Sequence, residues 1–118
     1  MMTLDQLKKE KSLINEIDWD MTPEEAVRLY LEWGNNWSGG NYVIRSKNDV
    51  SFYFVVNTWK EEPRVFLVKR SSETAEELAA FPLPEGVREP FLESVGRQKG
   101  VYAISGPVRE WLEKELGQ

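Results

Sequence analysis

The chain has 118 residues, of which 41% are hydrophobic and 30% charged, and its formal net charge at pH 7 is −5. These proportions are typical of a folded globular protein, and the length predicts one domain over residues 1–118. The sequence contains neither cysteine nor histidine, which excludes disulfides, thiol nucleophiles, zinc–thiolate centres and histidine-based catalysis.

The charge balance and the hydropathy pattern narrow the choice of partners. An acidic chain is disfavoured as a nucleic-acid binder, because phosphate backbones are bound by concentrated positive charge. No apolar run reaches the roughly 18 residues that a transmembrane helix needs. The N-terminal residues are too charged for a signal peptide. We therefore expect a cytoplasmic protein with no membrane or nucleic-acid partner.

Two helices are predicted in the N-terminal part of the chain. Residues 3–18 carry leucine and isoleucine at helical spacing, with Thr3 or Asp5 as the N-cap. Residues 22–33 begin with the sequence Thr-Pro-Glu-Glu, which combines an N-cap, a proline suited to the first turn and a capping-box glutamate.

Four carboxylates lie close together in sequence at the start of the second helix: Asp18, Asp20, Glu24 and Glu25. Such a group can bind a hard cation, but the glycine-containing pattern of a calcium loop is absent. The two glutamates also suit the positive end of the helix dipole. We therefore expect no metal and no other cofactor, and an enzyme dependent on these carboxylates, with or without a divalent cation, is kept as an alternative.

The stretch 34–41 is the strongest loop signal, since it consists mainly of glycine and asparagine. Trp33 and Trp37 flank its first half, which also contains Asn36. One interpretation is a recognition loop that exposes backbone amides beside aromatic side chains. The other is a helix-to-strand connection with one tryptophan packed in the core.

Three strands are predicted over residues 42–46, 50–59 and 64–70, and the short loops between them make the sheet an antiparallel meander. The central strand is the richest in β-branched and aromatic residues. One of its faces is apolar enough for a core: Val50, Phe52, Phe54, Val56 and Thr58. The other face is mixed, and is either half-covered or open to a ligand: Ser51, Tyr53, Val55, Asn57 and Trp59.

The C-terminal part is predicted to be mainly helical. Helices are expected over residues 71–81, 87–95 and 105–116, the first with a Thr74/Glu77 capping box. Val101–Ile104 is a short strand or an extended segment, and its pairing is left open. The predicted fold class is α+β, with a three-stranded antiparallel meander, and a fourth short strand if Val101–Ile104 pairs, packed on four to five helices.

The run from Trp19 to Val27, WDMTPEEAV, together with YLEWGNNW over residues 30–37, resembles a small family of uncharacterised bacterial proteins. The resemblance covers under a third of the chain. It implies a bacterial cytosolic source and no particular site residues.

The absence of the usual catalytic residue types favours a non-catalytic binding or protein-interaction module, and no catalytic residue is assigned. If helices cover the first face of the central strand, the aromatic second face could bind a protein partner or a second copy. The candidate binding residues are Trp33, Asn36, Trp37, Tyr53, Asn57 and Trp59. A small-molecule carrier with a pocket lined by Trp33, Trp37 and Trp59 is a further alternative.

Overall fold

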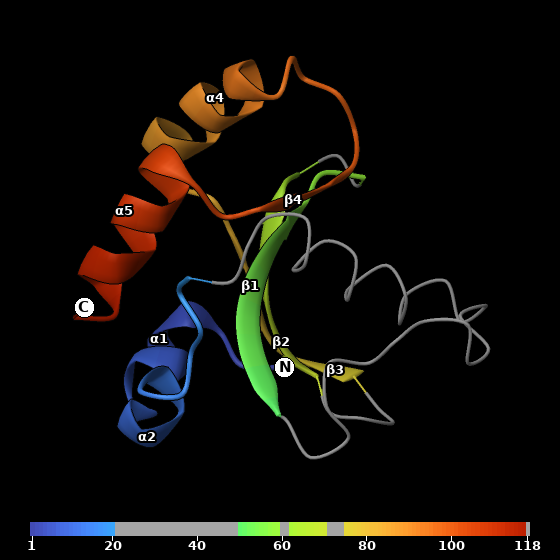
Figure 1. Ribbon diagram of the computed structural model, residues 1–118. Helices are drawn as coiled ribbons and strands as arrows, with labels where there is room; N and C mark the ends of the chain where they lie inside the picture. The colour runs from blue at the N-terminus through green and yellow to red at the C-terminus, as the bar shows by residue number, and fades with distance from the viewer. Residues whose placement is uncertain (21–49, 60–61, 71–74, 118) are drawn as a thin grey trace, which may run out of the picture.

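The structure is a computed structural model that describes residues 1–20, 50–59, 62–70 and 75–117 (Figure 1). The predicted helix over 22–33, the loop over 34–41 and the strand over 42–46 lie outside the described residues. The described elements in chain order are α1 (Leu4–Lys8), α2 (Lys11–Ile14), β1 (Ser51–Asn57), β2 (Arg64–Arg70), β3 (Ala75–Pro82), α4 (Glu85–Ser94), β4 (Val101–Ala103) and α5 (Gly106–Glu115).

The described strands form one antiparallel sheet in the order β3-β2-β1-β4. β1 and β2 pair along their full length, so that Phe54 lies opposite Leu67. β4 pairs with the end of β1 at Val55–Asn57, which shows that most of the segment Val101–Ile104 is a strand of the sheet. The described residues thus have an α+β fold in which β1, β2 and β3 form a meander.

The prediction of a helix over residues 71–81 is wrong, because Ala75–Pro82 forms β3. The Thr74/Glu77 pattern and the alanines favour a helix locally. However, Ala79, Phe81 and Leu83 are buried in the main core, whereas Pro82 between the last two is exposed. This alternation suits a strand, and pairing with β2 outweighs the local helical preference.

The predicted helix over residues 3–18 is two shorter helices. Its start is confirmed, since Thr3 Oγ1 accepts a hydrogen bond from the Gln6 N–H at 3.2 Å and Gln6 Oε1 accepts one from the Thr3 N–H at 2.9 Å. After α2 the chain becomes extended, and Ile17 forms a parallel bridge with Phe52 of β1. The Asp18 N–H donates to the Phe52 carbonyl at 2.8 Å, which ties this segment to the sheet.

The C-terminal helices lie close to their predicted positions. α4 begins before the predicted residue 87, and Pro90 lies inside the helix and not at its start. α5 begins at Gly106, one residue after the predicted start, with Pro107 in its first turn. The helices end at Val95 and Leu116, where Gly96 and Gly117 adopt the positive φ that glycine accepts readily.

The main core lies between the sheet and the described helices, which are on one side of the sheet in Figure 1. Phe54 is central to it: its ring lies 5.5 Å from that of Trp19 and 6.5 Å from that of Phe81, which in turn contacts Trp111. The helices contribute Leu7, Ile14, Phe91, Val108, Leu112 and Leu116. The predicted core face of β1 is confirmed at Phe54, Val56 and Thr58, whereas Val50 is exposed.

Two ion pairs connect the N-terminal segment to α5. Lys8 Nζ lies 2.6 Å from a Glu115 carboxylate oxygen, and the Arg109 guanidinium lies 3.3 Å from Asp20. The hydrogen bond from Lys8 lowers the pKa of Glu115 below its ordinary 4.5. Because these groups are at the surface, we expect them to fix the position of the segment more than to stabilise it strongly.

Replacing Phe81 tests whether β3 belongs to the core. Phe81→Ala removes a ring that is 3% exposed, and should lower the free energy of unfolding by about 3–5 kcal/mol in urea titrations. Pro82→Ala, at the exposed neighbour, is the matched control and should change it much less. A similar small effect of both variants would contradict the inward orientation of Phe81.

The ion pair between Lys8 and Glu115 should make stability depend on pH in a defined direction. A carboxyl group whose pKa is lowered on folding stabilises the protein above its unfolded pKa, and this contribution is lost as the pH falls through the folded value. Lys8→Gln should therefore destabilise the protein at pH 7, and the difference from the wild type should shrink in acid. Urea titrations of both proteins along a pH series measure it, and a difference independent of pH would contradict the pairing.

Candidate interaction surface

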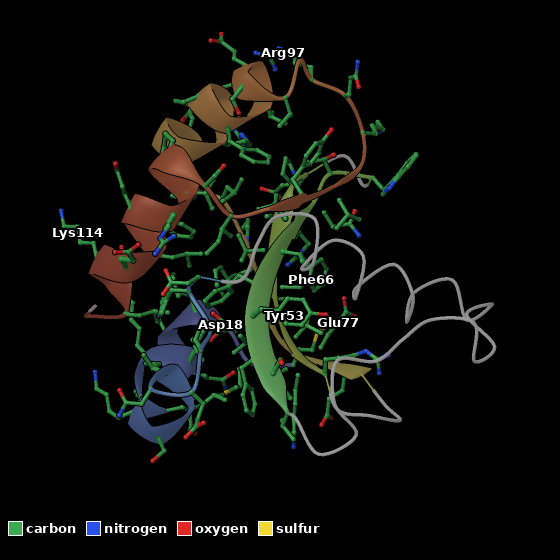
Figure 2. The ribbon with its side chains drawn as sticks, viewed as in Figure 1. Asp18, Tyr53, Phe66, Glu77, Arg97 and Lys114 are labelled. Atoms are coloured by element: carbon green, nitrogen blue, oxygen red, sulfur yellow. The ribbon has the colours of Figure 1, made fainter. Side chains whose placement is uncertain are left out.

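The face of the sheet away from the helices has a small core of its own. Tyr53, Val55 and Val68 are fully buried there, and Phe66, Val101 and Ala103 pack partly against them. Figure 2 shows Tyr53, Phe66 and Glu77 on this side of the sheet, opposite the side that carries Asp18. We call this surface the second face.

The centre of the second face is not an open aromatic surface. Tyr53, one of the predicted binding residues, is 1% exposed and so does not lie at the surface of this face. The neighbouring strands also place apolar residues on this face. Phe66 lies opposite Val55 from β2, and Ala103 lies opposite the same residue from β4. Together they form too much apolar surface to be left in water.

Trp59, at the end of β1, is the exposed aromatic residue of the described chain. The residue is 62% exposed, although its backbone is held on both sides. The Trp59 N–H donates to Asn57 Oδ1 at 2.9 Å, and its carbonyl accepts from Lys99 Nζ at 3.4 Å. The half-buried Asn57 therefore forms a local turn that positions the residue after the strand.

Thr58, the residue before Trp59, is held in place by hydrogen bonds to the segment 98–100. It is 5% exposed, and its N–H donates to the Gly100 carbonyl at 2.9 Å. Its hydroxyl oxygen accepts from the Gly100 N–H at 2.8 Å and lies 3.3 Å from the Gln98 carbonyl, to which it can donate. The Tyr102 hydroxyl also donates to the Gln98 carbonyl, at 2.7 Å. These bonds hold the segment 98–100 against the end of β1.

Two arginines that precede Lys99 in the sequence, Arg88 and Arg97, form ion pairs with glutamates. Arg97, which has a positive φ of 57°, donates to Glu89 at 2.9 Å, and this hydrogen bond lowers the pKa of Glu89. Arg88 lies 3.8 Å from Glu62, on the turn after Trp59. Asn57 and Lys99 are the polar residues that the structure places in contact with Trp59, through its backbone.

The predicted binding residues are only partly brought together. Trp33, Asn36 and Trp37 lie outside the described residues, so the tryptophan-lined pocket is not assembled from the described chain. Asn57 and Trp59 are in contact through their hydrogen bond, and Tyr53 is buried on the second face. Sequence reasoning placed Thr58 in the core but missed its bonds to Gly100, since nothing in the local pattern connects residues so far apart.

An acidic segment and a surface hollow lie elsewhere on the described chain. Asp18 accepts a hydrogen bond from the Asp20 N–H at 3.0 Å, and Asp20 faces Arg109, while Glu24 and Glu25 lie outside the described residues. In the ranges that are described, no set of three acidic side chains is placed to hold a metal ion. A shallow hollow of about 400 Å³ lies between the N-terminus and β3, and it contains no aromatic side chain; it is lined by Met1, Met2, Gln6, Lys9, Glu10 and Leu78.

Replacing Thr58 tests whether its hydroxyl group holds the segment 98–100 against the end of β1. Thr58→Val removes the acceptor of the Gly100 N–H and should lower the free energy of unfolding by about 1–3 kcal/mol. Thr58→Ser keeps the hydroxyl and should cost clearly less. Urea titrations of the two variants measure the difference, and equal losses would show that the hydroxyl does not hold the segment 98–100.

No protein-family model, curated protein or solved structure matches the chain significantly. Among the described helices, none is long and apolar enough to cross a membrane. The function is therefore inferred from the geometry of the described residues.

Proposed function

We propose that the chain is a non-catalytic protein-interaction module that contacts its partner through Trp59. The observation that carries the proposal is a tryptophan that is 62% exposed on a backbone fixed by Asn57, Thr58 and Lys99. Tryptophan is among the residues that contribute most to binding at interfaces. A side chain whose backbone is already ordered loses less conformational entropy on binding.

The rim of the site supports a protein partner over nucleic acid. Arg97 is paired with Glu89 and Arg88 with Glu62, so these two guanidinium groups already have carboxylate partners within the chain. A phosphate backbone would require cations without such partners, and the whole chain carries a net charge of −5. The resemblance to a bacterial family supports placing this module in a bacterial cytoplasm.

Purification from the native host followed by native mass spectrometry tests the proposal. The wild type should retain a protein partner, and Trp59→Ala should lose it while its melting temperature stays close to that of the wild type. Val50→Ala, at an exposed apolar residue on the other end of β1, is the matched control and should retain the partner.

Other outcomes of this experiment would reject the proposal. A Trp59→Ala variant that keeps the partner would show that the indole is not the anchor. A loss of several kcal/mol of stability, as for a buried aromatic residue, would show that Trp59 belongs to the core. A monomer that carries a fixed small extra mass would favour the small-molecule carrier.

A further inference from the structure

The two edges of the described sheet differ in how they are protected from pairing with another strand. At β3, the Met2 N–H donates to the Leu78 carbonyl at 2.9 Å, and the Ala80 N–H donates to the Met2 carbonyl at 3.1 Å. A β-bulge interrupts β3 beside Leu67 of β2, and Pro82 has no N–H to offer. Bound chain, bulges and prolines are recognised means of blocking an edge.

Within the described residues, the outer edge of β4 is blocked neither by bound chain nor by a bulge or a proline. The Thr58 N–H donates to the Gly100 carbonyl, and this backbone bond, with the pairing of Val56 opposite Tyr102, sets which residues of each strand face the neighbouring strand. Gly100 and Tyr102 therefore point their backbone groups toward β1, and Val101 and Ala103 point theirs away from it. No residue of the described chain forms a hydrogen bond with these four outward groups. The strand is short, but it contains no charge and no proline.

We propose that this edge pairs with β4 of a second copy of the chain. The two strands would run antiparallel about a two-fold axis at Tyr102, with Val101 of each copy opposite Ala103 of the other. Because both residues direct their N–H and carbonyl groups outward, this register satisfies all four groups of each strand. The result is one sheet that continues across the two copies.

The backbone groups along β4 favour a second copy of the chain as the partner of this edge. The outward groups are placed symmetrically about Tyr102, so the edge is complementary to itself. The register also places Lys99 opposite Ser105, so that no like charges face each other across the pair. The two Tyr102 residues would lie opposite each other at a non-hydrogen-bonded position, where aromatic pairs stabilise a sheet.

This inference rests on the proposed function only in requiring that the chain associates with protein. The residues that it uses are different, since Trp59 follows β1 and the edge belongs to β4. The two ideas can therefore fail separately.

A proline at position 103 tests the pairing without breaking the sheet within one chain. The Ala103 N–H points away from β1, so Ala103→Pro removes an outward donor and no bond of the β1–β4 ladder. Ala103→Ser keeps the N–H and is the matched control. In sedimentation velocity over a concentration series, the wild type and Ala103→Ser should be dimeric and Ala103→Pro should be monomeric.

Cysteine cross-linking tests the register, and it does so even if the proline variant does not fold. The chain has no cysteine, so each introduced thiol is unique. In the proposed register, Val101→Cys of one copy faces Ala103→Cys of the other at about 5.5 Å between Cα atoms, within the range of a disulfide. Under mild oxidation, a mixture of the two variants should form a linked dimer much faster than either variant alone.

Three results would overturn the inference. They are a wild type that is monomeric at all concentrations, an Ala103→Pro variant that folds and remains dimeric, and cross-linking no faster in the mixture than in the separate variants. If Trp59→Ala abolishes association and Ala103→Pro does not, the Trp59 surface stands and the β4 edge is rejected. If only Ala103→Pro abolishes it, the edge stands and Trp59 is not the anchor.

Discussion

The burial of both faces of β1 is the constraint on which the rest of the structure depends. Val55 and Val56 are neighbours in sequence, and both are completely buried. Successive side chains of a strand point to opposite sides, so the sheet must be enclosed on both. The described helices enclose the side of Val56, while the side of Val55 has its own small core with Tyr53 and Val68. The exposed aromatic residue of the described chain, Trp59, accordingly lies beyond the end of β1 and not in the middle of the sheet.

The sequence predicts elements well where local preference and long-range packing agree. In β1 and β2, β-branched and aromatic residues favour a strand, and each strand has a neighbour to pair with. In α5, a proline in the first turn and apolar residues at helical spacing give the correct bounds to within a residue or two. The prediction fails at β3, where Thr74 and Glu77 favour a helix but β2 supplies hydrogen bonds that only a strand can use. Such competition is decided by tertiary pairing, which a local pattern does not contain.

The candidate site was predictable only in its most local part. Trp59 and Asn57 lie two residues apart on one face of the predicted strand over residues 50–59, and the structure joins them by a hydrogen bond just after β1. Tyr53 is on the same face as Asn57 and is buried in a cluster against which Phe66 and Val101 of other strands pack. The contribution of Thr58 depends on Gly100, which reaches it only after the chain has passed through β2, β3 and α4. An isolated strand pattern shows which residues share a face, and not what covers that face.

The place of β4 beside β1 also bears on the order in which the chain folds. β1, β2 and β3 are consecutive and joined by short connections, so their pairing closes small loops at low entropic cost. β4 pairs with Val55–Asn57 of β1, although β2, β3 and α4 lie between the two strands in the chain. Contacts between such distant parts of a chain form slowly. We therefore infer that the meander forms the early nucleus and that β4 with α5 joins late. Until then the end of β1 that carries Trp59 lacks its neighbour, so the exposed indole takes its final position only when folding is complete.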